Sequence, residues 1–134
     1  MPERSEGSTE LGIGHVGKTV AQELKIISDF YDFMLWMLQR TEKFPRHHRY
    51  SLGLSIENRL QAILSMLLRA KYSREKQAWL AEANIELEVL RFQLRLAKDL
   101  KVLAVRSHGF AARSLDSIGA QLGGWLKQRT ATKR

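Results

Sequence analysis

The chain has 134 residues, 44% of them hydrophobic and 27% charged, which suits one ordinary globular domain. It contains no cysteine, which excludes disulfides, thiolate catalysis and thiolate metal sites. The first residues lack the apolar segment of a signal peptide, and no stretch approaches about 18 uninterrupted apolar residues. We therefore expect a cytoplasmic protein without a membrane span.

The formal net charge is +8, and it is not confined to one tail. Residues 1–20 carry a net charge of −1 and residues 127–134 carry +4, which leaves +5 for the rest of the chain. A basic body of this kind attracts polyanions, nucleic acid first and anionic membrane second. The membrane is the weaker partner, because each apolar helix face predicted below already has a bundle or a subunit to pack against.

Residues 1–20 are rich in Gly, Ser and Glu and lack hydrophobic periodicity, so we expect a flexible lead. Within this lead, residues 12–19 (GIGHVGKT) match the phosphate-loop pattern G-x-x-x-x-G-K-[ST] letter for letter. A phosphate loop works between a buried strand and a helix of a parallel sheet, and the polar residues 4–10 cannot form that strand. We therefore predict no nucleotide site in this segment.

The rest of the chain shows the periodicity of amphipathic helices. Four are predicted, over residues 21–43, from about 48 or 50 to 71, about 73–105 and about 110–127. Helices of about 20 residues joined by short loops predict an all-α fold, an antiparallel up-down-up-down four-helix bundle over residues 21–127. Residues 128–134 are expected to form a basic tail.

The first predicted helix has a broad apolar face. One row with helical spacing consists of Leu24, Ile27, Tyr31, Met34, Leu35 and Leu38. Four further residues widen it: Phe30, Phe33, Trp36 and Met37. The helix is expected to end at Phe44-Pro45, because a residue before proline disfavours the helical region.

Ser73 is a candidate N-cap of the third helix, and Ser107 and Gly109 mark the break before the fourth.

The third predicted helix is apolar on two opposite sides. Its inner row, spaced by three and four, is Leu80, Ala83, Leu87, Leu90, Leu94 and Ala97. The outer row, roughly 160–200° away, is Ile85, Val89, Phe92, Leu96 and Leu103. A domain of this size has room to bury only one side, so the outer row is predicted to form an interface between subunits of an oligomer.

Charged residues of the same helix are sorted onto two edges. Arg91, Arg95 and Lys98 follow i, i+4, i+7 between the apolar rows, and Glu82 and Glu86 lie on the opposite edge. Two interpretations stay open: solvated edges with ordinary helix ion pairs, or a basic track that becomes a ring when subunits assemble. Under the second, these three cations are the first candidates for phosphate contacts.

Two basic clusters lie at predicted helix junctions. Arg46 and Arg49 belong to the first junction, and Arg69, Lys71 and Arg74 belong to the second, at the other end of an antiparallel bundle. Arg40 and Lys43 adjoin the first cluster but could equally complement the end of the first helix, and Lys76 adjoins the second. Such a distribution suits a long, sequence-indifferent polyanion contact better than a small anion site. The aromatic residues are expected mostly in the apolar faces, so no exposed base-stacking platform is predicted.

Catalytic and metal-binding residues are not predicted. His47 and His48 are adjacent, so on a helix they point about 100° apart and cannot hold one metal from one face. The sequence has no H-x-x-x-H pair and no nucleophile, base and orienting residue in a known pattern. We expect no cofactor and no enzymatic activity.

The order of segments over residues 21–127 resembles the accessory variability determinant (Avd) proteins of diversity-generating retroelements. In chain order the resemblance rests on Tyr31-Asp32, Trp36, Glu42-Lys43-Phe44-Pro45-Arg46, Arg49-Tyr50, Ile56-Glu57-Asn58, Ala70-Lys71-Tyr72-Ser73-Arg74, Ala83-Asn84, Leu87, Leu90-Arg91-Phe92, Leu96-Ala97-Lys98-Asp99-Leu100, Ile118-Gly119 and Gly123-Gly124-Trp125. No single motif is diagnostic, but their order and spacing together are fairly specific. A related bundle family, encoded by intervening sequences in ribosomal RNA genes, is also similar.

The resemblance implies a four-helix bundle that assembles into a basic pentameric ring. It implies a non-enzymatic partner of the retroelement's reverse transcriptase, which copies a template repeat with errors at adenines. The mutated copy then replaces a variable repeat in a target gene, a process called mutagenic retrohoming. The accessory protein is expected to hold the enzyme and the RNA or cDNA together.

Another function fits the same sequence. A purely structural oligomeric bundle could use its basic surface to bind an acidic protein partner, with no nucleic-acid role. Salt-sensitive binding to RNA or DNA of mixed sequence separates the two, because only the first function predicts it.

Overall fold

The computed structural model describes residues 14–133 of the chain. These residues form the helices α2 (Gly14–Thr41), α3 (Arg46–His48), α4 (Leu54–Tyr72), α5 (Lys76–Asp99) and α6 (Val105–Lys133), with a short π-helical segment, η2 (Arg49–Gly53), leading into α4. The prediction of an all-α helical bundle is confirmed for the described residues. None of their helices has both the length and the apolar character that crossing a membrane requires.

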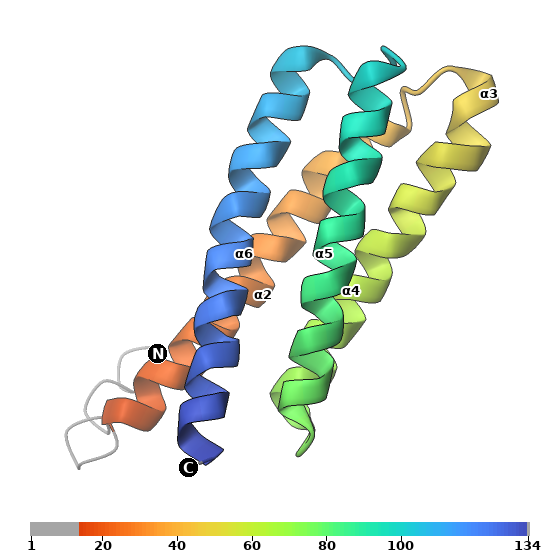
Figure 1. The fold of residues 1–134 in the computed structure, drawn as a ribbon. Coiled ribbons are helices and arrows are strands. Elements are labelled where there is room, and N and C mark those ends of the chain that lie inside the picture. The colour runs from red at the N-terminus through yellow and green to blue at the C-terminus, as the bar shows by residue number, and fades with distance from the viewer. Residues whose placement is uncertain (1–13, 134) are drawn as a thin grey trace, which may run out of the picture.

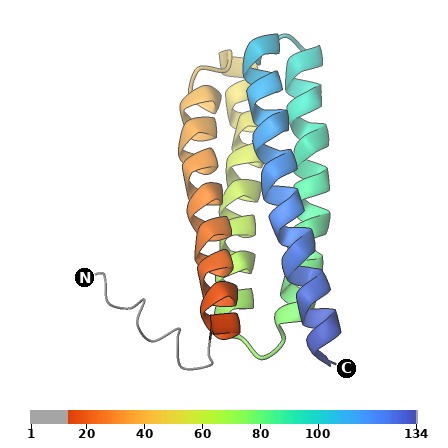
Figure 2. The same ribbon diagram turned by 90° about the vertical axis from the view of Figure 1, so that its left-hand side faces the viewer.

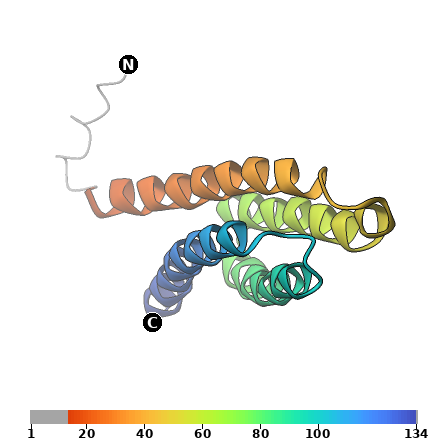
Figure 3. The same ribbon diagram turned by 90° about the horizontal axis from the view of Figure 1, so that it is seen from above.

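The four long helices form a closed bundle in which each packs against two others. α4 contacts α2 and α5, and α6 contacts the same two helices from the other side. Figures 1 and 2 show the α2–α4 and α5–α6 connections at one end of the bundle. The α4–α5 turn, the start of α2 and the end of α6 lie at the opposite end. Seen from above, α4 and α6 lie between α2 and α5 (Figure 3).

The core is built from one buried stripe on each helix. The inner row predicted for the third helix is buried in α5 at all six positions, Leu80, Ala83, Leu87, Leu90, Leu94 and Ala97. The α4 and α6 stripes that face it include Ile56, Leu60, Ile63, Leu67, Ala111, Leu115, Ile118 and Leu122. Burial of these side chains supplies most of the driving force for folding.

The buried face of α2 differs from the sequence-based expectation. Leu24, Tyr31 and Leu35 were placed in the first apolar row, yet about half of each side chain is exposed. The buried side chains are instead those of three widening residues, Phe30, Phe33 and Met37, of Met34 from the first row, and of Ile26, which the prediction did not include. The apolar arc of this helix exceeds what one core can cover, and the edge with the larger aromatic side chains buries more area.

Several helix ends also differ from the prediction. α2 begins at Gly14, so the second part of the phosphate-loop match lies in a helix, while Gly12 and Ile13 lie outside the described residues. α6 continues from Val105 to Lys133, so Ser107 and Gly109 do not break it and most of the predicted basic tail is helical. The rest of the expected lead, residues 1–11, and Arg134 also lie outside the described residues.

Leu103 was predicted in the outer row of the third helix, and this position is wrong. α5 ends at Asp99, and Lys101 adopts a positive φ of 65°, which reverses the chain direction. The backbone N–H groups of Val102 and Leu103 then donate to the carbonyl oxygen of Ala97, at 3.0 and 3.2 Å. Leu103 therefore folds back into the core of its own bundle and is only 4% exposed.

Polar cross-links join each adjacent pair of long helices. They connect α2 to α4, α4 to α5, α5 to α6 and α6 to α2 through Thr41 and Glu57, Arg59 and Glu86, Arg91 and Asp116, and Gln121 and Asp29. The Thr41 hydroxyl, which is fully buried, donates to the Glu57 carboxylate at 2.6 Å. The polar groups of each link meet only when the two helices have one particular axial offset, so together the links favour one alignment of the helices.

Candidate nucleic-acid interface

The outer row of α5 is exposed, as its sequence spacing suggested. Ile85, Val89, Phe92 and Leu96 are all exposed, from 36% at Val89 to 64% at Phe92. Leu100, just beyond the end of the helix, continues the row. We call Ile85, Val89, Phe92, Leu96 and Leu100 the α5 stripe. A contiguous apolar row of this kind is unusual on the free surface of a monomer.

A second exposed apolar row lies on α2, and sequence reasoning missed it. It consists of Val20, Leu24, Tyr31 and Leu35, which we call the α2 stripe. The signal was present in the sequence, because the apolar arc of this helix was too wide for one core. α4 and α6 separate α2 from α5 (Figure 3). The exposed stripes of these two helices are therefore expected on different sides of the bundle.

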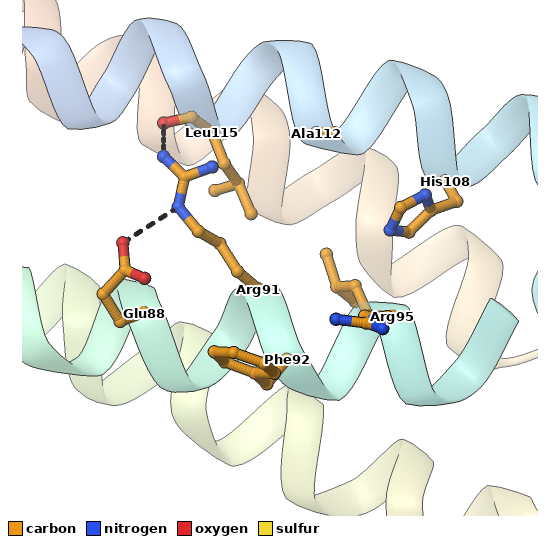
Figure 4. Close-up of a pocket in the computed structure, with 8 residues that line it drawn as sticks. Glu88, Arg91, Phe92, Arg95, His108, Ala112 and Leu115 are labelled. Carbon is orange, nitrogen blue, oxygen red and sulfur yellow. Dashed lines mark hydrogen bonds and ion pairs between the residues drawn. The ribbon is translucent and has the colours of Figure 1, made fainter. Parts of the chain in front are cut away.

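Arg91, the first of the three predicted phosphate-binding cations, is held by its own bundle. Its guanidinium donates to the Asp116 carboxylate at 2.8 Å and to the Leu115 carbonyl at 3.0 Å, and it lies 3.3 Å from Glu88. Figure 4 shows the side chain extending from α5 to Leu115 on α6, with Glu88 beside it. Arg91 therefore ties two helices together, and its charge is largely balanced.

Arg95 and Lys98 keep more of their charge available. Their cationic atoms lie 3.9 and 4.0 Å from the same carboxylate, Asp99, at the limit of ion pairing. Asp99 and Arg95 are both well exposed, and solvent-exposed pairs at this distance contribute little. These two residues can exchange Asp99 for a phosphate at small cost.

A groove of about 290 Å³ lies between α5 and α6 beside these residues. Its lining consists of Glu88, Arg91, Phe92, Leu94, Arg95, His108, Ala112 and Leu115 (Figure 4). Partial burial lowers the pKa of His108, and the neighbouring Lys98 and Arg95 lower it further, against the opposing effect of Asp99. At neutral pH the imidazole is therefore a neutral hydrogen-bonding group rather than a further cation.

The two junction clusters carry the least compensated positive charge. Arg46, Arg49, Arg69 and Arg74 are exposed and Lys71 is half-buried. Within the described part of the chain, no carboxylate lies at ion-pairing distance from any of these five. They lie at opposite ends of α4, as the sequence predicted (Figure 1). The geometry thus favours these residues over Arg91 for contact with phosphates.

Each junction cluster also holds an exposed tyrosine, contrary to the expectation that aromatic side chains lie in the apolar faces. Tyr50 is 68% exposed and Tyr72 is 77% exposed. The Arg49 guanidinium lies 5.6 Å from the ring centre of Tyr50, and the Lys71 ammonium lies 4.7 Å from that of Tyr72. The expectation that the aromatic residues lie mostly in the apolar faces therefore does not hold for Tyr50 and Tyr72.

Metal-ligating residues do not gather in the part of the chain that the structure describes. No group of three or more His, Asp or Glu side chains there has the geometry to hold a metal ion. The rings of His47 and His48 lie next to each other with their centres 4.2 Å apart and their planes tilted by 47°.

A comparison of the sequence with known protein families identifies the family of the chain. A family model described as bAvd-like matches residues 23–129. The chain belongs to the bAvd-like family. This confirms the resemblance to Avd proteins that the order of sequence motifs indicated. No curated protein and no solved structure matches the chain.

The bAvd-like match coincides with the bundle. It starts within α2, ends within α6, and includes both stripes except Val20 and both junction clusters. Residues 12–19, which match the phosphate-loop pattern, lie outside it. Apart from Val20, the candidate surfaces of this bAvd-like protein are therefore in the family's own part of the chain.

Proposed function

We propose that this bAvd-like protein is a non-catalytic accessory protein of a diversity-generating retroelement. It binds the reverse transcriptase together with RNA or cDNA in the cytoplasm and supports mutagenic retrohoming. Family membership supports the link with the reverse transcriptase. The observation that carries the nucleic-acid role is the uncompensated positive charge of the two junction clusters, Arg46, Arg49, Arg69, Lys71 and Arg74, at opposite ends of α4.

The protein acts as an oligomer, and its two stripes supply the contacts. The α2 stripe of one subunit packs against the α5 stripe of the next, which is a head-to-tail interface between two different surfaces. Repeating such a contact closes a ring when the rotation allows it, and the resemblance implies five subunits. The up-down-up-down order of helices places the junction clusters at the two ends of each subunit, so assembly arranges them as rings of charge.

The error-making chemistry belongs to the reverse transcriptase. The accessory protein contributes electrostatic contacts with phosphates. Such contacts bind RNA and DNA with little sequence preference, and the affinity that they give falls strongly as the salt concentration rises. A ring of such contacts keeps the template and its copy close to the enzyme. Arg95 and Lys98 add to this surface, because their shared partner Asp99 holds them only at the edge of ion-pairing distance.

The test is the affinity for RNA of mixed sequence at several salt concentrations. Charge reversal of Arg46, Arg49, Arg69 and Arg74 is expected to weaken binding and to flatten its salt dependence, by about 0.7 in the logarithmic slope per lost contact with a single strand. Arg113→Glu, a change at an exposed position of α6 away from the clusters, is the control for a single reversal. Unchanged affinity and salt dependence in the multiple variant would contradict the proposal.

The partner is tested separately. The native protein is expected to co-purify with the reverse transcriptase encoded beside it, and more so when the template RNA is present. If the protein instead ignores RNA and captures an acidic protein through the same arginines, the structural-adaptor function is correct.

A further inference from the structure

We propose that the two ends of α4 are stacking sites for unpaired bases, built on Tyr50 and Tyr72. This inference rests on the proposed nucleic-acid role and specifies the form of the ligand, which is single-stranded rather than duplex. The juxtaposition that carries it is an exposed aromatic ring, a cation over one face of that ring, and further uncompensated cations beside it.

The first site is centred on Tyr50. The Arg49 guanidinium lies over the ring at 5.6 Å, and Arg46 is exposed nearby without a carboxylate partner among the described residues. Tyr50 belongs to the π-helical segment η2, and such segments occur often at functional sites. A Cβ atom at Gly53 would lie 3.3 Å from the His48 carbonyl oxygen, so the backbone of the segment that carries Tyr50 is closely packed.

The second site is centred on Tyr72, the last residue of α4. The Lys71 ammonium lies 4.7 Å from its ring centre, and Arg69 and Arg74 are exposed on either side in the sequence. The Lys76 ammonium donates to the carbonyls of Ala70 and Lys71 at 2.9 and 2.6 Å, which caps the end of α4. This platform is therefore also fixed to a helix end rather than carried on a free loop.

An aromatic ring has two faces, and the cation occupies one of them. The other face remains for a nucleobase, while the cations beside it neutralise the adjoining phosphate. Stacking of one base on a protein aromatic ring changes affinity by about 5- to 150-fold, and it tolerates any sequence because every base has a π-face. Bases of a duplex are already stacked on each other, so they cannot use the platform.

The same surface could instead bind a protein, because exposed tyrosines are common in protein interfaces. The charge around the rings favours nucleic acid. Each tyrosine has a cation over its ring and, within four residues along the chain, exposed arginines with no carboxylate partner among the described residues. The two tyrosines lie 22 residues apart along one helical path. At about 1.5 Å per residue this is roughly 33 Å, a distance that a flexible single strand can bridge.

The experiment measures affinities of the full chain for a short single-stranded RNA and for the matched RNA duplex by fluorescence anisotropy. Tyr50→Ala and Tyr72→Ala are each expected to weaken single-strand binding by about 5- to 150-fold and to leave duplex binding unchanged. Tyr50→Phe and Tyr72→Phe are the matched controls, because they keep the stacking face, and both are expected to bind as the native protein does.

Alanine variants that bind the single strand as tightly as native protein would overturn the stacking sites, while the nucleic-acid role would stand. Equal losses for single strand and duplex would also overturn them, because that pattern reports a structural effect on the cations. Loss of reverse transcriptase binding with RNA affinity unchanged would assign the tyrosines to a protein interface instead. If the native protein binds neither RNA, the proposed function itself fails.

Discussion

Arg91 and Arg95 are one helical turn apart on α5 and have the same chemistry, yet the structure gives them different roles. Arg91 reaches Asp116 and the Leu115 carbonyl on α6, whereas Arg95 lies at the edge of ion-pairing distance from Asp99 on its own helix. The sequence could show that both project from one edge of a helix. It could not show Asp116, which lies 25 residues further along the chain.

This difference predicts that two similar substitutions affect different properties, one the stability of the fold and the other RNA binding. Arg91→Ala is expected to lower the free energy of unfolding by about 1–2 kcal/mol, because it leaves the Leu115 carbonyl and Asp116 without their charged donor. Arg95→Ala is expected to change it by less than about 0.5 kcal/mol and to weaken RNA binding instead. Urea unfolding and RNA titration of both variants check this, and equal unfolding free energies would contradict the role assigned to Arg91.

Asp29 makes the link between α2 and α6 dependent on pH. Its pKa is lowered by the hydrogen bond from Lys25 and by that from Gln121, which outweigh its partial burial. A carboxyl group with a lowered folded-state pKa stabilises the fold fully above its unfolded pKa and loses that contribution as the pH falls through the folded value. The pH window therefore lies at and below the ordinary value of 3.8.

The expected result is a stability difference between native protein and Asp29→Asn that is present at neutral pH and shrinks as the pH falls below about 4. Thermal unfolding at several pH values measures it, with Asp32→Asn as a control on the same helix. A difference that stays constant down to acidic pH would mean that the carboxylate charge does not stabilise this link.

At the scale of the helices, prediction succeeded where the apolar spacing of a helix was compatible with only one buried row. The inner row of α5 alternates by three and four without competitors, and all six predicted positions are buried. The α2 pattern was ambiguous because two apolar arcs adjoin, and only packing shows that Phe30 and Phe33 are buried while Tyr31 is exposed. The end of α5 could not be located from periodicity, because it depends on the backbone at Lys101, whose positive φ turns the chain so that Leu103 returns to the core.

The two stripes predict a specific behaviour of paired variants. Phe92→Glu disables the α5 stripe and Tyr31→Glu disables the α2 stripe, so each variant alone is expected to sediment as a monomer. A mixture of the two is expected to form dimers, because the intact α2 stripe of one variant can pack against the intact α5 stripe of the other. Sedimentation velocity measures both, with Leu68→Glu on α4 as a control that still assembles.

A mixture that stays monomeric would contradict the head-to-tail contact. Dimers formed by either variant alone would also contradict it, because they would show that one stripe pairs with itself.

For the whole molecule, the decisive property is how positive charge is distributed over the surface of the bundle. The sequence predicted the junction clusters and their opposite placement along α4. It ranked Arg91 first for phosphate contact, however, because it could not show which cations are already balanced by carboxylates of the same bundle. Nor could it show that Tyr50 and Tyr72 stand exposed among the uncompensated cations, since only the fold determines which aromatic residues the core covers.

The central claim is that this bAvd-like protein is an oligomer whose basic surface binds nucleic acid. The most direct test is its absolute mass by light scattering, with and without a short RNA, at low and at high salt. The account predicts a discrete oligomer whose mass rises when RNA is added at low salt and returns to the protein value at high salt. A monomer of 15.4 kDa that does not respond to RNA would contradict it.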